Sequence, residues 1–328
     1  MSSQPELILL TGGAGFIGSH VAEALLGRGY RVLIVDNLDP FYSPSRKRAN
    51  LEEIARAGHF DLEELDIVEY GPLRELVRRS RPLSIIHLAA RAGVRPSIEQ
   101  PRLYESTNVQ GTVNLLECCR EFRVKRFVFG SSSSVYGATS RVPFSEDQVE
   151  CRPISPYAAS KLAGELYCYT YAHLFSLECI CLRFFTVYGP RQRPDLAIHK
   201  FTALLESGKT LPVFGDGSTG RDYTFVDDIV AGVLSALEWK DRSNHVVPFE
   251  VFNLGNSHPV KLNELIAALE SATGHKATIE RLPEQPGDVT LTWAQIGKAC
   301  QFLGYQPRTP LEQGLKLFVS WFRDQQPG

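Results

Sequence analysis

The chain has 328 residues, long enough for one large α/β domain and a smaller lobe. Its 43% hydrophobic and 22% charged residues are those of an ordinary globular protein, and its net charge of −2 gives no global reason to bind nucleic acid or an anionic membrane. No apolar run approaches the roughly 20 residues of a membrane span, and the N-terminus lacks signal-peptide features. Seven cysteines without metal-ligand spacing predict a cytoplasmic protein with reduced thiols and no metal site.

The first predicted unit consists of a strand, a glycine-rich turn, a helix and a second strand. The strand 7–10 leads into Thr-Gly-Gly-Ala-Gly-Phe-Ile-Gly at 11–18, where a helical pattern begins. Gly12 permits a tight turn, Gly15 lets a pyrophosphate approach the helix N-terminus, and Gly18 lets helix and strand pack closely. This order is the dinucleotide-binding fingerprint, and its glycine spacing points to the short-chain dehydrogenase branch.

The second strand, 31–36, ends on Asp36, which decides between the two nicotinamide cofactors. A carboxylate at this place accepts hydrogen bonds from a ribose 2′-hydroxyl and repels a 2′-phosphate. The basic run Arg46-Lys47-Arg48 could instead pair with a phosphate, but two prolines precede it and we interpret it as the solvated face of a helix. The sequence therefore predicts NAD rather than NADP.

Strands and helices alternate through the first two thirds of the chain, which predicts a Rossmann-type doubly wound parallel sheet. Further strands are expected at 61–66, 83–88, 126–130 and 177–184, and further helices at 70–79, 101–122 and 156–175. We expect residues 1–184 to form this domain, with 226–256 returning to it through a helix at 227–239 and a strand at 251–254. The rest of 185–328 would form a smaller substrate-binding lobe.

The candidate chemistry begins at Tyr157-Ala-Ala-Ser-Lys161. A tyrosine and a lysine four residues apart lie on one face of a helix. A phenol with a pKa near 10 is a poor base at neutral pH, but a nearby ammonium and a positively charged nicotinamide favour the phenolate. Because this pair follows a dinucleotide-binding glycine fingerprint in the same chain, it predicts a catalytic acid–base centre.

A hydroxyl partner is expected at the end of the strand before it, in the run Ser131 to Ser134 followed by Val-Tyr-Gly. At this point the chain resembles the extended short-chain dehydrogenase/reductase family of nucleotide-sugar epimerases and dehydratases. The resemblance implies that Ser132 bonds the sugar 4-oxygen beside Tyr157. It also implies a set of cofactor-binding residues: Gly12, Gly15, Phe16, Ile17, Gly18, Asp36, Asn37, Asp66, Ile67, Leu88, Ala89, Ala90, Asn108, Tyr157 and Lys161.

Two residues after this serine distinguish among the reactions of the family. The dehydratases that the chain resembles carry an Asp-Glu pair directly after the hydroxyl, and the decarboxylases carry a Glu two residues after it. Here Ser133 and Ser134 occupy these places. A hydroxyl of ordinary pKa cannot act as the acid or base of an elimination at neutral pH, so redox epimerisation is favoured.

Segments farther along narrow the resemblance to the UDP-glucuronate 4-epimerases. Residues 183–195, Arg-Phe-Phe-Thr-Val-Tyr-Gly-Pro-Arg-Gln-Arg-Pro-Asp, are similar to the segment that follows the sixth strand in that group. Residues 285–289 are similar to a second signature, and 220–228 to the nucleotide-binding region of the wider family. Gln295 departs from the Asp that relatives often have there, but it lies outside the catalytic set.

A uronate demands a cation near the sugar C6, and Arg191 and Arg193 are the candidates, because a guanidinium can hold a carboxylate with two hydrogen bonds. Residue matching favours Arg193, although both could be loop ion pairs. His87, on an apolar strand, is interpreted as structural. The resemblance implies the following substrate-binding residues: Arg95, Ser132, Ser133, Thr186, Arg193, Arg221 and Asp288.

The expected activity is NAD-dependent 4-epimerisation of UDP-glucuronate to UDP-galacturonate through a 4-keto intermediate, by a homodimer. The alternatives are an epimerase for UDP-glucose or an N-acetylhexosamine, a UDP-glucuronate decarboxylase, and a non-enzymatic NAD-sensing regulator. The set Ser132, Tyr157 and Lys161 counts against the regulator, because cofactor binding requires no phenolic base.

Overall fold

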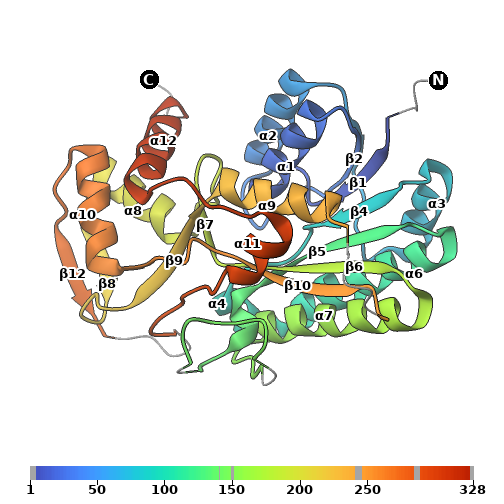
Figure 1. Cartoon of the computed structure of the whole chain (residues 1–328). Helices are drawn as coiled ribbons and strands as arrows, with labels where there is room; N and C mark the ends of the chain where they lie inside the picture. The colour runs from blue at the N-terminus through green and yellow to red at the C-terminus, as the bar shows by residue number, and fades with distance from the viewer. Residues whose placement is uncertain (1–4, 140, 149–150, 241–245, 284–288, 326–328) are drawn as a thin grey trace.

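In a computed structural model, a seven-stranded parallel sheet forms the centre of the molecule (Figure 1). The structure describes residues 5–139, 141–148, 151–240, 246–283 and 289–325. The strand order is β10-β6-β5-β4-β1-β2-β3. Strands β2 and β3 are therefore added on one side of β1, and β4, β5 and β6 on the other, so the strand order reverses between β1 and β4. The strands are β1 (Leu7–Thr11), β2 (Arg31–Val35), β3 (Asp61–Glu63), β4 (Ser84–His87), β5 (Arg126–Ser132), β6 (Glu178–Phe184) and β10 (Phe249–Leu254).

Helices cover both faces of this sheet, as the alternating pattern predicts. One face carries α1 (Phe16–Gly27), α2 (Pro44–Ala57) and α9 (Val226–Glu238), and the other carries α3 (Tyr70–Ser80), α6 (Gly111–Phe122) and α7 (Pro156–Phe175). The helix expected at 101–122 is built from α5 (Pro101–Glu105), a π-helical turn at Ser106–Gln110, and α6. A short helix, α4 (Val94–Glu99), precedes it. The predicted Rossmann-type fold is confirmed.

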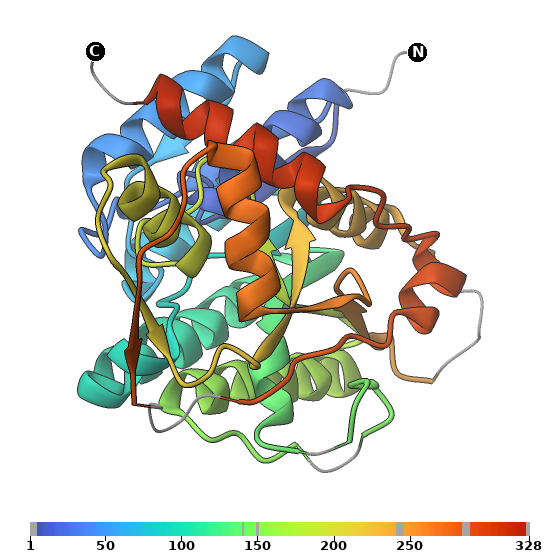
Figure 2. The same cartoon turned by 90° about the vertical axis from the view of Figure 1, so that its left-hand side faces the viewer.

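The later part of the chain builds a second group of elements beside the carboxyl ends of the strands (Figure 2). It contains a three-stranded sheet in the order β11-β9-β7 and a two-stranded sheet of β12 and β8. Its strands are β7 (Thr186–Tyr188), β8 (Leu211–Phe214), β9 (Gly220–Phe225), β11 (Pro259–Lys261) and β12 (Ile279–Leu282). Its helices are α8 (Ala197–Glu206), α10 (Leu262–Thr273) and α12 (Leu311–Asp324), while α11 (Gly297–Leu303) packs against α9 and β10.

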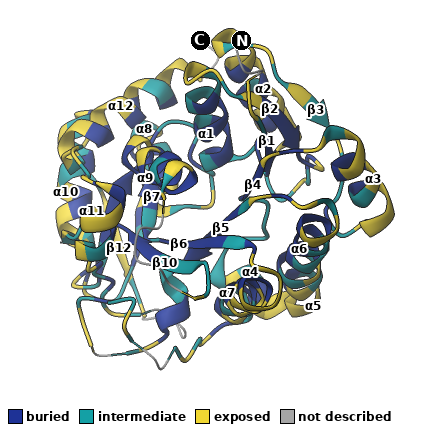
Figure 3. Cartoon of the chain, turned by 45° about the vertical axis from the view of Figure 1, so that its right-hand side comes forward, coloured by how far each residue is buried: buried dark blue, intermediate teal, exposed yellow. Residues whose placement is uncertain are grey.

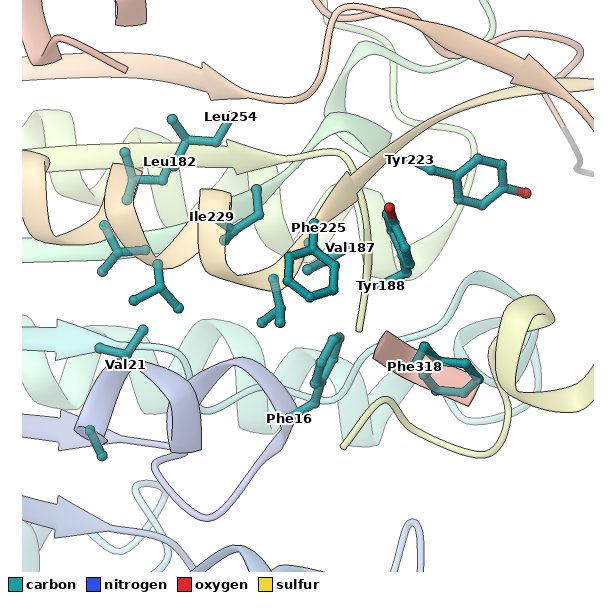
Figure 4. Close-up of a cluster of buried hydrophobic side chains, with 14 of the residues drawn as sticks. Phe16, Val21, Leu182, Val187, Tyr188, Tyr223, Phe225, Ile229, Leu254 and Phe318 are labelled. Carbon is teal, nitrogen blue, oxygen red and sulfur yellow. The ribbon is translucent and has the colours of Figure 1, made fainter. Parts of the chain in front are cut away.

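Burial follows the layers: the strands of the central sheet are buried, and the helices are buried on their inner sides (Figure 3). One cluster of buried apolar side chains runs from α1 and α9 into the second group of elements (Figure 4). Phe16 and Val21 of α1 belong to the same cluster as Phe318 of α12. The two parts of the chain therefore share a hydrophobic core, which holds the space between them in a fixed shape.

Strand β10 pairs in parallel with β6, from Phe249 opposite Cys179 to Leu254 opposite Phe184. The segment expected at 226–256 thus adds a strand to the main sheet, and α9 packs against α1. In the part of the chain that the structure describes, no helix combines the length and apolar character needed to cross a membrane.

Candidate active site

A cavity of about 520 Å³ opens at the carboxyl ends of the central strands, between the main sheet and the second group of elements. It lies where the strand order reverses between β1 and β4, the place where open α/β sheets bind their ligands. Fourteen of the fifteen predicted cofactor-binding residues line it: Gly12, Gly15, Phe16, Ile17, Gly18, Asp36, Asn37, Asp66, Ile67, Leu88, Ala89, Ala90, Tyr157 and Lys161.

The glycine turn has the geometry that its sequence predicts. Gly12 has φ +72°, and a Cβ added there would lie 2.6 Å from the backbone nitrogen of Ala89. A Cβ on Gly18 would lie 2.1 Å from the carbonyl oxygen of Gly12. Gly15 is the N-cap of α1 and has no side chain to fill the space in front of the helix N-terminus. This turn leaves room for a diphosphate at the positive end of the helix.

The expectation that the basic run at 46–48 forms the solvated face of a helix is wrong for Lys47. Lys47 does not lie on a solvated face: it is buried, it lines the cavity, and its Nζ lies 3.0 Å from Asp36 Oδ1. The Asp36 carboxylate also accepts the backbone N–H of Leu38 at 2.9 Å and of Ala14 at 3.2 Å. Asp36 is therefore held in the cavity by a buried lysine that the sequence pattern assigned to solvent.

Asn108 is the predicted cofactor residue that does not line the cavity. Its side-chain oxygen accepts the backbone N–H of Arg91 at 2.8 Å, and its Nδ2 donates to the Arg91 carbonyl at 2.9 Å and to Ser160 Oγ at 2.9 Å. It pins the loop after β4 to α7, and its neighbour Thr107 faces the cavity instead. Asn108 lies in a π-helical turn, and the sequence pattern indicates neither this turn nor the direction of the Asn108 side chain.

Helix α7 places Tyr157 in its first turn. The helix begins after Ser155, whose hydroxyl accepts the backbone N–H of Ala158 at 3.1 Å, and Pro156 occupies the first helical position. Burial raises the pKa of Tyr157, while a hydrogen bond with Ser132 and the charge of Arg193 act to lower it. Ser132 and Tyr157 therefore lie beside each other in the cavity.

Lys161 lies one turn farther along α7 than Tyr157, and both residues line the cavity. Its Nζ donates to the carbonyl of Gly130 at 2.8 Å, and burial lowers the pKa of this lysine to about 8. The charge of Arg193 acts to lower the pKa of Tyr157. Arg193 comes from the segment after β7 and lines the same cavity as Tyr157.

The neighbouring serines divide their roles. Ser131 donates to Glu165 at 2.5 Å, and Glu165 forms a buried pair with Arg183 through bonds of 2.9 and 2.7 Å. Ser132 accepts the backbone N–H of Ser134 at 3.2 Å, which caps a short 3₁₀ turn. Ser133 and Ser134 both line the cavity.

The two candidate arginines separate clearly. Arg191 pairs with Glu23 and bonds His20 on α1, and it does not line the cavity. Arg193 does line it, where it lies 5.3 Å from the centre of the Phe41 ring and makes a two-bond ion pair with Asp195, at 3.0 and 2.7 Å. The structure therefore places Arg193, and not Arg191, beside Tyr157.

The remaining predicted substrate residues have different positions. Thr186 lines the cavity at the start of β7. Arg95 lies 5.4 Å from the centre of the Phe214 ring, and Arg221 donates to the carbonyl of Gly220 at 2.8 Å; neither lines this cavity. Asp288 lies outside the described residues. Of the described substrate candidates, Ser132, Ser133, Thr186 and Arg193 thus line the cavity, and these two arginines do not.

Two histidines have ordinary structural partners. His87 contacts Thr11 Oγ1 at 2.7 Å and Thr112 Oγ1 at 3.0 Å, and its burial holds its pKa well below the usual value. His199 lies 2.8 Å from Arg46 Nη1. Within the described ranges, no three His, Cys, Asp or Glu side chains gather as a metal site.

Sequence reasoning missed the segment between β2 and α2. Asp39, Phe41, Tyr42 and Lys47 all line the cavity, and Asp39 pairs with Arg91, which also lines it. The only signal was the concentration of aromatic and basic residues directly after Asp36. Because this segment is a loop and a helix start, no periodic pattern fixes the direction of its side chains.

Comparison with known proteins defines the class. Residues 9–318 match the family model described as GDP-mannose 4,6 dehydratase, and the chain belongs to this family, whose members include extended short-chain dehydrogenases/reductases. A UDP-glucuronate 4-epimerase of Thermodesulfobacterium geofontis is 41% identical over 317 residues, which cover 96% of both chains.

Solved structures agree with this relationship. The structure of UDP-glucuronic acid 4-epimerase from Bacillus cereus, in complex with UDP-glucuronic acid and NAD, has a TM-score of 0.90 at 36% identity and covers 98% of this chain and 100% of the other. A UDP-glucose 4-epimerase from Thermotoga maritima with UDP-glucose has a TM-score of 0.88 at 36% identity, with coverage of 97% and 99%.

Proposed function

We propose that this protein is an NAD-dependent 4-epimerase that interconverts UDP-glucuronate and UDP-galacturonate. The observation that carries the proposal is Arg193: its guanidinium lines the cavity close enough to Tyr157 to lower the pKa of the phenol. A cation beside the catalytic hydroxyls suits a sugar whose C6 is a carboxylate. The similarity to UDP-glucuronate 4-epimerases over nearly the whole chain supports the same conclusion.

The residues present fit NAD. The space in front of Gly15 would hold the diphosphate, Asp36 would face the adenosine ribose, and Tyr157 and Lys161 line the other part of the same cavity. When bound, NAD⁺ supplies a reversible hydride acceptor for the sugar C4. Because the cofactor is regenerated in each cycle, we expect it to remain bound between turnovers.

The side chains of the protein move and hold the protons. Tyr157 removes the proton of the sugar 4-hydroxyl as C4 is oxidised, and returns it to the 4-oxygen after the keto sugar has turned its other face. Ser132 bonds the same oxygen, and its contact with Tyr157 favours the phenolate. Lys161 keeps a positive charge in the cavity, and its ammonium is held in place by a hydrogen bond to the Gly130 carbonyl.

Arg193 has a second role in the proposal, because the intermediate is a β-keto acid that can lose CO₂. Decarboxylation is easiest when the C5–C6 bond stands perpendicular to the carbonyl plane. A guanidinium that binds the carboxylate with two hydrogen bonds would hold that bond out of this orientation. Ser133 and Ser134 supply no carboxylate that could act as an acid or base for dehydration, although the family model is described by a dehydratase.

An epimerase for a neutral UDP-sugar is the second candidate. The similarity to a UDP-glucose 4-epimerase at 36% identity favours it, because that protein shares the fold and nearly the whole length. In that case Arg193 would form only its ion pair with Asp195 and would bind no substrate carboxylate.

The test is to incubate the purified protein with UDP-glucuronate and, separately, with UDP-glucose, and to follow the products by NMR. Formation of UDP-galacturonate, without UDP-galactose at a comparable rate, would support the proposal. Faster conversion of UDP-glucose would move the function to a neutral sugar, and formation of a UDP-pentose as the main product would indicate a decarboxylase.

We further propose a cytoplasmic homodimer in which 185–328, apart from 226–256, forms the UDP-sugar lobe. The seven cysteines are all unpaired thiols, which suits a reducing compartment. Helix α7 exposes Leu166 and Leu174, each 61% accessible, two turns apart on one face. Two such apolar helical faces packed together would remove them from water.

A further inference from the structure

We propose that the hydroxyl of Tyr42 binds the diphosphate of the nicotinamide cofactor. Tyr42 lies between Asp36 at the end of β2 and the start of α2 at Pro44, in the segment that sequence reasoning left without a role. Its side chain lines the cavity. The proposal concerns cofactor binding and does not depend on which sugar the protein converts.

The first observation is that this hydroxyl is buried and has no hydrogen-bond partner among the described residues. A buried hydroxyl without a partner costs free energy, so native structures usually satisfy such groups with protein, water or ligand. The Asp36 carboxylate accepts hydrogen bonds from Lys47 and from the backbone N–H groups of Ala14 and Leu38, and it makes none with this hydroxyl. The free donor therefore faces a cavity built for a ligand.

The second observation is the position of the hydroxyl over the glycine turn. A Cβ built on Gly15 would lie 3.9 Å from the Tyr42 hydroxyl oxygen. Gly15 is the N-cap of α1, a helix of 12 residues, and the dinucleotide fingerprint places the pyrophosphate at this helix end. A phosphate oxygen in front of the helix would lie between the α1 N-terminus and the Tyr42 hydroxyl.

The third observation is the charge around the ring. Lys47 Nζ lies 5.7 Å from the ring centre, and Arg46 and Arg193 also act on the hydroxyl, against the negative charges of Asp36 and Asp195. Burial raises the pKa of Tyr42 to about 12, so the hydroxyl keeps its proton and can donate it in a hydrogen bond at neutral pH. A neutral donor among cations is suited to a phosphate oxygen.

In this proposal, the Tyr42 hydroxyl donates a hydrogen bond to the side of the diphosphate that faces away from the glycine turn. The helix N-terminus would bind one side of the group through backbone N–H groups, and the Tyr42 hydroxyl would bind the other. Because the segment also carries Lys47, which fixes Asp36, one stretch of chain would hold both the ribose contact and the diphosphate contact.

The test is Tyr42→Phe in the full chain after removal of bound nucleotide. We expect the dissociation constants of NAD and ADP-ribose, measured by titration calorimetry, to rise on the order of 10-fold, because one hydrogen bond to a charged group is lost. Adenosine, which has no phosphate, should bind as it does to the wild type. The matched control is Tyr30→Phe, whose hydroxyl bonds Glu238 at 3.3 Å outside this cavity and should leave all three affinities unchanged.

Thermal unfolding of the nucleotide-free protein separates binding from a structural role. Without nucleotide, the unfolding midpoint temperature of Tyr42→Phe should equal or exceed that of the wild type, because the variant loses a buried hydroxyl that has no partner. Addition of NAD should raise this midpoint temperature less in the variant than in the wild type. Unchanged NAD affinity would overturn the proposal. So would an equal loss for adenosine, or a lowered midpoint without nucleotide, because each would mean that Tyr42 shapes the loop instead of binding phosphate.

Discussion

Arg193 faces two carboxylates, that of its neighbour Asp195 and that of the proposed uronate. Asp195 occupies the edge of the guanidinium formed by Nε and Nη2. Nη1 makes no hydrogen bond with another described residue and is therefore available to a ligand. A planar guanidinium can bind carboxylates along two of its edges, so the ion pair and the substrate contact are compatible.

Replacement of Arg193 by Leu should weaken UDP-glucuronate binding by about 10- to 100-fold, because a charge-assisted contact is worth roughly 1.5–3 kcal/mol. UDP-glucose lacks the charge and should bind as before. The measurement is calorimetry with both sugars, and Arg191→Leu is the control, since Arg191 pairs with Glu23 outside the cavity. Parallel losses for both sugars in Arg193→Leu would show that this arginine only supports the loop.

Tyr157→Phe should lower turnover by at least ~100-fold while NAD stays bound, because the variant keeps the ring and loses only the acid–base group. Steady-state rates, together with the nucleotide content of the purified variant, provide the measurement. Turnover near the wild-type rate would remove Tyr157 from the mechanism.

The pair of Asp36 and Lys47 leads to a prediction about cofactor choice. The wild type should bind NAD at least ~10-fold more tightly than NADP, because a buried carboxylate repels a 2′-phosphate. In Asp36→Ala the Lys47 ammonium loses its partner at 3.0 Å and becomes available to that phosphate, so the preference should shrink. Adding Lys47→Ala should cancel the gain for NADP. Equal affinity of the wild type for both cofactors, measured by calorimetry, would contradict the role of Asp36.

At the scale of elements, α7 is the platform that carries the chemistry. Tyr157 and Lys161 lie on its first turns, and Glu165, one turn farther, joins it to β5 and β6 through Ser131 and Arg183. Gly164 allows the helix to approach the sheet closely, because a Cβ there would lie 2.4 Å from the Phe129 ring. The position of the catalytic side chains therefore depends on a small residue on the buried side of the helix.

Gly164→Ala should destabilise the protein by about 1–3 kcal/mol, the usual cost of overfilling a packed core, and should lower turnover by shifting α7. The control is Gly27→Ala at the end of α1, where an added Cβ meets no atom within 4 Å. That substitution should be neutral or slightly stabilising. Denaturant unfolding and rate measurements on both variants test the pair; equal stability of the two would mean that the Phe129 ring can move aside.

The elements also show how far local sequence patterns reach. The strands and helices around 7–35, 126–132 and 156–184 are predicted closely, because each has a clear period and clear ends. The helix at 101–122 is predicted as one unit, but its π-helical turn is not, and that turn directs Asn108 away from the cavity. One extra residue in a turn changes which side chain faces a ligand without changing the apolar pattern.

For the whole molecule, the exposed face of α7 leads to a prediction about assembly. Leu166→Glu together with Leu174→Glu should convert the proposed dimer into a monomer in light scattering after gel filtration, because charges would then face an apolar partner surface. Leu317→Glu on α12 is the control: that side chain is also exposed, at 47%, but lies on another element. A wild-type protein that elutes as a monomer would contradict the proposal.

The features that lie within one element or one turn can be predicted from the order of residues alone: the glycine turn before α1, Asp36 at the end of β2, and the placement of Tyr157 and Lys161 one turn apart on α7. Their geometry is local, since a helix or a strand end fixes the spacing of its own side chains. Three other features follow only from how the chain packs: Arg193 rather than Arg191 lines the cavity, Lys47 turns inward to Asp36, and the Tyr42 hydroxyl lies near Gly15. These contacts join loop residues to distant elements, and the direction of a loop side chain is set by the surfaces that the loop packs against, which no periodic pattern records.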